Sequence, residues 1–133
     1  METYYETGEL RAKYNLKENM LDGIMKTYNK TGQLQEENNY KYGKQEGLSK
    51  TFYNKGQPKM LWNYNAGKRE GICKAYYLSG KLKLEANYKN DKRHGISKVY
   101  YETGQLKTEW TDREGELVRV MKRYSESGQS REE

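Results

Sequence analysis

The sequence has few of the residues that build a thick hydrophobic core. Of its 133 residues only 33% are hydrophobic, whereas ~45–50% is usual for globular chains. It has one cysteine, one histidine, one proline and no apolar run that approaches the length of a membrane-spanning helix. A single cysteine excludes an intrachain disulfide, and a single histidine excludes a multi-histidine metal site. The low hydrophobic fraction makes a thick two-layer core improbable.

Low hydrophobicity combined with abundant charge is also typical of disordered chains. Three features of the composition oppose that interpretation. The net charge is only +6 because acids and bases are mixed, aromatic residues reach 13%, and proline is nearly absent. The distribution of glycine then indicates an ordered architecture.

The 13 glycines fall on a lattice with a step of 24 residues. The first register holds Gly8, Gly32, Gly56, Gly80, Gly104 and Gly128. The second holds Gly23, Gly47, Gly71 and Gly95, and the third holds Gly43, Gly67 and Gly115. A fixed period of this length indicates a repeat protein. We predict a single domain over residues 1–133, with repeats at 1–23, 24–47, 48–71, 72–95 and 96–119 and a partial repeat at 120–133.

Each repeat is predicted to form a β-hairpin. Residues 96–101 are rich in β-branched and aromatic side chains, and Gly104 stands in a turn where a positive φ is needed. Residues 105–111 form the return strand, and residues 112–115 form the next turn. The fold class is therefore all-β: an elongated single-layer antiparallel sheet of successive hairpins. Exposed edge strands at its two ends would permit end-to-end self-association.

The turn predicts which residues share a face. If Tyr101 pairs with Gln105, alternation places one apolar set on the half-buried face. That set is Ile96, Tyr100, Leu106 and Trp110. The other face, predicted to be mostly wet, carries Ser97, Val99, Tyr101, Lys107 and Glu109. Strict alternation puts Lys98 on the apolar face. Its stem can lie along an aromatic ring while the charge reaches water, or a β-bulge can turn it out.

The repeat unit resembles a known family. The stretch Tyr-Tyr-Glu-Thr-Gly-Gln-Leu-Lys (100–107), and Asn-Tyr-Lys-x-x-Lys-x-x-Gly (87–95) before it, resemble MORN-type repeats, in particular the bacterial variant. This resemblance covers essentially the whole chain. It implies a single-layer sheet of hairpins and a role in binding or scaffolding, usually with proteins and sometimes with membrane lipids. Some bacterial relatives resemble antitoxin or immunity proteins. The chain departs from the pattern at Asn19, Asp91 and Arg119, which replace glycines.

Catalytic, metal and cofactor sites are not predicted. His94 shares its column with Asp22, Glu46 and Glu70, which is a polar turn position. Cys73 is interpreted as a small strand residue, because an activated thiol needs a neighbouring base or cation. No phosphate-binding loop occurs. We therefore expect a protein without enzymatic activity and without a cofactor.

Two kinds of surface column hold the functional information. One basic stripe is formed by Lys26, Lys50, Lys74, Lys98 and Lys122. A candidate partner-binding surface is formed by Tyr5, Tyr53, Tyr77, Tyr101, Lys59, Lys83 and Lys107. The lysines could attract acidic proteins or anionic lipid, or they could only solubilise the sheet and pair with interleaved glutamates. The tyrosines could form a flat contact area for a partner or pack as cross-strand rungs.

These columns favour a non-enzymatic protein-interaction or scaffolding module, with an antitoxin or immunity role as one form of it. The partner would then be a protein such as a toxin or a surface protein. The alternative is peripheral binding to anionic membrane lipids through the basic columns. Nucleic acid is a weaker alternative, because the net charge is modest and no nucleic-acid module matches. A cytoplasmic location is expected if Met1 is the native start, and an exported one if a leader was removed.

Overall fold

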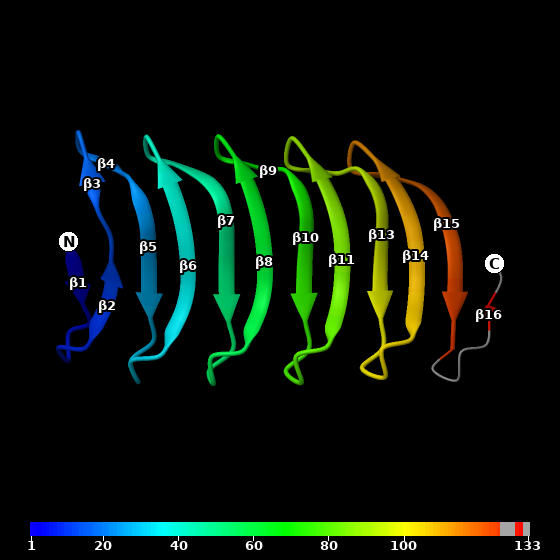
Figure 1. Cartoon of the computed structure of the whole chain (residues 1–133), viewed down its shortest axis with the longest axis horizontal. Helices are drawn as coiled ribbons and strands as arrows, with labels where there is room; N and C mark the ends of the chain where they lie inside the picture. Colours follow the sequence, from blue (N-terminus) through cyan, green and yellow to red (C-terminus); the bar gives the residue numbers. More distant parts are fainter. Residues whose placement is uncertain (126–129, 132–133) are drawn as a thin grey trace. The chain divides into compact units, whose positions relative to one another are not determined.

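The computed structural model describes residues 1–125 and the backbone of residues 130–131. Its contacts divide the chain into two compact units, Met1–Lys68 and Arg69–Glu133, which we call unit 1 and unit 2. The predicted all-β class is confirmed, because the described residues form strands and turns and no helix. In each unit, successive hairpins lie side by side in one open antiparallel layer (Figure 1). The position of Gly128 lies outside the described residues.

Unit 1 contains eight strands. They are β1 (Glu2–Tyr4), β2 (Leu10–Lys13), β3 (Leu16–Lys17), β4 (Met20–Leu21), β5 (Gly23–Tyr28), β6 (Leu34–Lys41), β7 (Lys44–Phe52) and β8 (Pro58–Asn65). The sheet order is β1-β2-β5-β6-β7-β8, and β3 and β4 form a separate short ladder. Pro58 begins β8, a position where the missing N–H is tolerated.

Unit 2 repeats the same arrangement. Its strands are β10 (Gly71–Tyr76), β11 (Leu82–Lys89), β12 (Lys92–Arg93), β13 (Gly95–Tyr100), β14 (Leu106–Arg113), β15 (Glu116–Tyr124) and β16 (Ser130–Arg131), and β9 (Lys68–Arg69) spans the unit boundary. The sheet order is β10-β11-β13-β14-β15-β16, with β12 beside β11.

Two kinds of turn alternate along the chain. The long turns contain the first five glycines of the first register, Gly8, Gly32, Gly56, Gly80 and Gly104. For example, Gly104 has a φ of +93° and donates its N–H to Tyr101 O at 2.9 Å. The short turns have two central residues, both with positive φ, which is the requirement of a type I′ turn. Asn19 (φ 64°) and Asp91 (φ 71°) adopt this conformation where other repeats have glycine. Asn and Asp tolerate it better than most residues, so these departures preserve the turn.

The predicted pairing at the long turn is confirmed, but a β-bulge changes the register beyond it. Tyr101 N–H donates to Gln105 O at 2.9 Å, and Tyr100 pairs with Leu106. The register then shifts between Val99 and Tyr100. The same shift occurs in the other hairpins, between Thr3 and Tyr4, Thr27 and Tyr28, Thr51 and Phe52, and Ala75 and Tyr76.

The bulge makes the predicted assignment of the two faces wrong. Ser97, and not Ile96, pairs with Trp110. Ser97 is only 1% exposed and Val99 is half-buried, whereas Ile96 is 42% exposed. Lys98 alternates with Ser97 and therefore shares the side of Ile96. We call the side of Ser97, Val99 and Trp110 the packed face and the side of Ile96 and Lys98 the open face.

The packed face buries only small or medium side chains completely. The buried residues are Ala12 and Ser49 in unit 1 and Cys73, Ala86, Ser97 and Asp112 in unit 2. The larger side chains beside them, such as Trp110, stay half-buried. In a single-layer sheet a side chain is shielded from solvent only when larger side chains surround it on the same face. This explains why so few hydrophobic residues are sufficient for the fold.

Successive repeats are joined at the short turns by backbone hydrogen bonds. In unit 1 the N–H of Gly67 donates to Gln45 O at 2.8 Å, and in unit 2 the N–H of Asp91 donates to Arg69 O at 3.0 Å. The preceding turn residue is held by a side chain of the previous repeat. Asn90 N–H donates to Glu70 Oε2 at 2.8 Å. These contacts satisfy turn N–H groups that have no partner within their own hairpin.

His94 occupies the same column as Glu70 and has the same structural function. Glu114 N–H donates to His94 Nδ1, but at 3.4 Å. A carboxylate accepts a stronger hydrogen bond than a neutral imidazole does. Unit 2 therefore contains one strong and one weak version of the same contact.

The two versions predict different sensitivities to truncation. Glu70→Ala should lower the free energy of unfolding by about 1 kcal/mol, because it leaves the Asn90 N–H without its acceptor. His94→Ala should cost clearly less. Chemical denaturation of both variants, followed by circular dichroism, measures the difference. Equal losses for the two variants would contradict the assigned role of the column.

The tyrosine hydroxyls form a second set of contacts between repeats, near the long turns. Tyr5 Oη donates to Tyr28 O at 2.6 Å in unit 1. Tyr77 Oη donates to Tyr100 O at 2.6 Å, and Tyr101 Oη donates to Tyr124 O at 2.8 Å, in unit 2. Each bond spans 23 residues and joins one hairpin to the next.

Removal of one such hydroxyl should weaken the fold without changing the surface. Tyr101→Phe should lower the free energy of unfolding by about 1 kcal/mol, because the Tyr124 carbonyl loses a donor. Tyr42→Phe is the matched control, since Tyr42 is 64% exposed at a short turn. The two midpoints of urea denaturation give the comparison. A control variant that is destabilised as much as Tyr101→Phe would refute the explanation.

Candidate partner-binding surface

In each of the five complete hairpins the bulge places one residue of the return strand out of register. In the last complete hairpin Val99 pairs with Thr108 and Tyr100 with Leu106, so Lys107 has no paired residue across that ladder. The same position holds Arg11, Gln35, Lys59, Lys83 and Lys107 in successive hairpins. All five are exposed. We call this column the bulge row.

The lysines of the bulge row lie over the tyrosines that follow the outgoing strands. The ammonium group of Lys59 is 5.7 Å from the ring centroid of Tyr53 in unit 1. In unit 2 the corresponding distances are 5.6 Å for Lys83 and Tyr77 and 5.5 Å for Lys107 and Tyr101. The structure thus brings the predicted tyrosines and lysines together as pairs. Tyr5 has a different cation over its ring, that of Lys30 at 5.7 Å.

The tyrosines are half-buried, and Tyr5, Tyr77 and Tyr101 use their hydroxyls within the fold. Of the two predicted roles, the hydroxyl contacts correspond to rungs between hairpins. The ring faces carry the lysines, so each exposed lysine has its ammonium group over an aromatic ring. Asn29 stands in the tyrosine column of the second repeat. Its Oδ1 accepts N–H bonds from Thr31 and Gln33 at 3.0 and 2.9 Å instead.

The second predicted column, the basic stripe, has a different electrostatic environment. In unit 2 Glu85 pairs with Lys74 and Lys98, and Glu109 pairs with Lys98 and Lys122. In unit 1 Glu37 pairs with Lys26 and Lys50 in the same way. Lys26, Lys50, Lys74 and Lys98 are half-buried, and Lys122 is exposed. Each glutamate therefore stands between two lysines and reduces the field of the stripe.

A row of exposed aliphatic residues was not predicted from the sequence, because simple alternation placed Ile96 on the half-buried face. Ile24 and Leu48 in unit 1 are 45% and 42% exposed, and Ile72 and Ile96 in unit 2 are 49% and 42% exposed. The asparagines beside them bind the backbone: Asn87 Nδ2 donates to Ile96 O at 3.0 Å. The bulge near the long turn was the missing signal, because it shifts the alternation by one residue.

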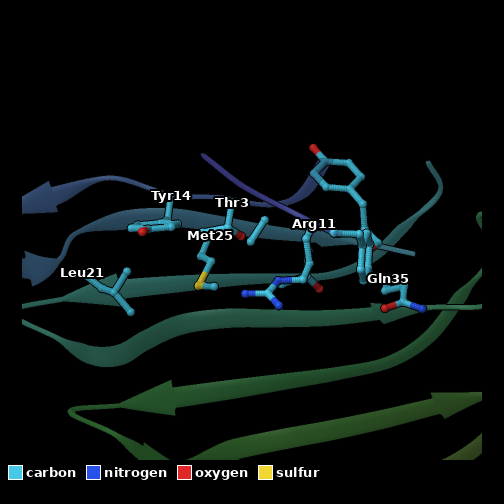
Figure 2. A pocket seen from close by; sticks show the side chains of 10 residues that line it. Thr3, Arg11, Tyr14, Leu21, Met25 and Gln35 are labelled. Atoms are coloured by element: carbon cyan, nitrogen blue, oxygen red, sulfur yellow. The ribbon is translucent and has the colours of Figure 1, made fainter. Parts of the chain in front are cut away.

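A hollow of about 530 Å³ lies in unit 1 (Figure 2). Its walls include Ala12, Tyr14, Leu21 and Met25, and Arg11 is the charged residue among those that line it. Figure 2 shows Met25 beside the Arg11 guanidinium, with Leu21 farther away on the other side of Met25. The mainly apolar walls offer contact area rather than reactive groups.

The groups that could support chemistry are placed unfavourably for it. Cys73 is 1% exposed, and burial raises the pKa of its thiol to about 11, so the reactive thiolate is scarce at neutral pH. Among the residues that the structure describes, no three His, Cys, Asp or Glu side chains gather as a metal site. Within the same residues, no helix is long and apolar enough to cross a membrane.

Comparison with protein families agrees with this geometry. The model of the MORN repeat variant matches residues 21–42, 45–66, 69–90 and 93–111, which together exceed half of the chain. Each of the first three matches begins at a residue whose carbonyl accepts a turn N–H from the next repeat and ends at the first residue of that turn. No curated protein matches the chain at a significant level. MORN repeats are typically modules that bind proteins or membrane lipids, and they are generally non-catalytic. The chain belongs to the MORN repeat variant family.

Proposed function

We propose that the protein is a non-enzymatic interaction module that binds an acidic surface of a protein partner through the bulge row and its tyrosines. The supporting observation is the contrast between the two lysine columns. Lys59, Lys83 and Lys107 are exposed and out of register at the bulges. The lysines of the basic stripe face glutamates across the strands instead. Cations that are not balanced within the sheet remain available to an outside carboxylate.

The tyrosine under each ammonium group assists such binding. An exposed cation–π contact contributes about 0.5–1 kcal/mol and restrains the lysine side chain. Less side-chain entropy is then lost when a partner binds. In unit 2, the pairs Tyr77–Lys83 and Tyr101–Lys107 are one hairpin apart, which is ~10 Å for two strand spacings. Carboxylates at a similar spacing would match both pairs.

An immunity-type role is one specific form of this function, with a toxin as the protein partner. The resemblance of the repeats to those of such proteins supports it. A general scaffold that holds a cellular protein is the other form. Both forms use the same surface, so the identity of the captured partner distinguishes them.

Binding to anionic membrane lipids is the second candidate. It is favoured by the exposure of the same three lysines and by the net charge of +6. The partial balancing of the basic stripe by Glu37, Glu85 and Glu109 reduces the cationic area that a flat membrane would need. The protein-binding proposal needs only a local match, which is why we prefer it.

The lysine columns provide a matched pair of variants for a test. Lys59→Gln/Lys83→Gln/Lys107→Gln and Lys26→Gln/Lys50→Gln/Lys74→Gln remove the same charge. With each protein as bait in native lysate, quantitative mass spectrometry should show partners that are retained by the wild type and the stripe variant. The bulge-row variant should lose at least about tenfold of the signal, equivalent to ~1.4 kcal/mol. Equal retention by both variants would refute the proposed surface.

The membrane alternative has its own measurement. Co-sedimentation of the wild type with phosphatidylserine-containing vesicles should be weak at physiological salt if the proposal is correct. Strong binding that falls steeply with ionic strength would favour the membrane, since salt screens lysine–headgroup attraction. Neutral phosphatidylcholine vesicles serve as the control.

A further inference from the structure

The hollow in unit 1 lies where one column of the packed face has its smallest side chain. In successive repeats this column holds Ala12, Glu36, Met60, Leu84 and Thr108. Ala12 pairs with Thr27 across the ladder, so two short side chains stand side by side between β2 and β5. The space above them is about 530 Å³, which is within the range of small-ligand sites.

The walls of this hollow combine apolar surface with a single charged group. Ala12, Leu21 and Met25 provide aliphatic contact, and Tyr14 provides an aromatic ring. Arg11 contributes a guanidinium group, and no Asp or Glu occurs among the described residues that line the hollow. The charge that a ligand meets there is therefore positive and is not balanced by an acid in the wall.

Arg11 differs from the lysines of the bulge row in how it is held. In the same unit, Lys59 has its ammonium group 5.7 Å from the ring centroid of Tyr53. The corresponding ring in the first hairpin, that of Tyr5, carries Lys30 instead. Arg11 is exposed, and within residues 1–125 its guanidinium makes no hydrogen bond, ion pair or ring contact. Its donors are thus both accessible and unused.

The position of the guanidinium group connects it to the apolar wall. Figure 2 shows it beside Met25, which is one of the lining residues. Glu36 is the acidic member of the Ala12 column and pairs with Thr27, so it stands two strand spacings, ~10 Å, from Ala12. Glu36 does not line the hollow. A ligand that places an anion on Arg11 can therefore cover Met25 with its apolar part.

A carboxylate is the anion that fits one guanidinium group. The two groups are planar and can form two parallel charge-assisted hydrogen bonds. The single positive charge of Arg11 balances one carboxylate, whereas a phosphate monoester carries about −1.5 to −2 at pH 7. An apolar body attached to the carboxylate removes the aliphatic and aromatic walls from water, which a simple anion does not do.

We propose that the hollow in unit 1 binds a small free carboxylic acid that carries an apolar body. The carboxylate accepts hydrogen bonds from the Arg11 guanidinium, and the body packs against Ala12, Leu21 and Met25. This site goes beyond the proposed function, which depends on the lysines of the bulge row, because none of those lysines lines the hollow.

Four probes test the chemical class of the ligand. The compounds 3-phenylpropanoate, 3-phenylpropanamide and 3-phenylpropylamine carry an anionic, a neutral and a cationic group on one body, and propanoate lacks the ring. The ε-methyl signal of Met25 in methyl-¹³C-methionine protein reports binding, and that of Met60, outside the lining, is the internal control. The phenyl acid should give a saturable Met25 shift with about tenfold higher affinity than the amide, equivalent to ~1.4 kcal/mol. The amine and propanoate should bind more weakly than the phenyl acid.

Three variants locate the site. Arg11→Gln introduces the residue of the next bulge-row position, Gln35, and should abolish the preference for acid over amide. Lys59→Gln removes the same charge elsewhere in unit 1 and should leave the affinity unchanged within about twofold. Ala12→Leu introduces the residue found at Leu84 and should abolish the Met25 shift by filling the hollow.

The results that would overturn the proposal are specific. They are equal affinity for the acid and the amide, no saturable Met25 shift with the acid, or an unchanged preference in Arg11→Gln. Loss of binding in Lys59→Gln, or retained binding in a folded Ala12→Leu protein, would also overturn it. Arg11 is an exposed residue and the probe series uses the wild type, so the test remains decisive even if Ala12→Leu does not fold.

Discussion

The β-bulge beside the long turn of the five complete hairpins is the constraint on which the rest of the structure depends. It inserts one residue into the return strand, so every residue farther from the turn changes its partner across the ladder. Ser97 enters the packed face because of this shift, and Ile96 is excluded from it. The inserted residue itself is left without a cross-strand partner. In three hairpins that residue is a lysine, which makes the bulge both a determinant of the fold and the source of the candidate surface.

The sequence was sufficient to predict the repeat, the hairpins and the turns. Glycines at fixed positions signal positive φ, and Asn19 and Asp91 can replace them because their backbones tolerate the same conformation. The two faces could not be predicted correctly, because simple alternation assumes an unbroken ladder. Lys98 indicated that simple alternation fails in this strand, because a charged lysine is unfavourable on a half-buried apolar face. Placing the bulge next to Tyr100 would have resolved that conflict.

The candidate surface was predictable as a set of residues but not as an arrangement. The columns of Tyr77 and Lys83 are visible in the sequence, yet their pairing depends on how the bulged residue turns toward the ring. The use of the Tyr77 hydroxyl within the fold depends on a contact that spans 23 residues. Burial of Asp112 had no sequence signal apart from its difference from Tyr88. Differences between repeats are therefore as informative as their similarities, because the shared residues support the sheet and the exceptions show where one repeat departs from it.

The contacts between repeats have a further consequence for how such a chain can change in length. Each tyrosine hydroxyl bond and each turn hydrogen bond joins positions at a constant offset, close to one period. Loss or gain of a whole period brings equivalent donors and acceptors back into register, so every interface can form again with a new neighbour. Loss of a single residue inside a hairpin shifts one set of donors away from all of its acceptors. Duplication or deletion of whole 24-residue repeats is therefore the change in length that this architecture tolerates.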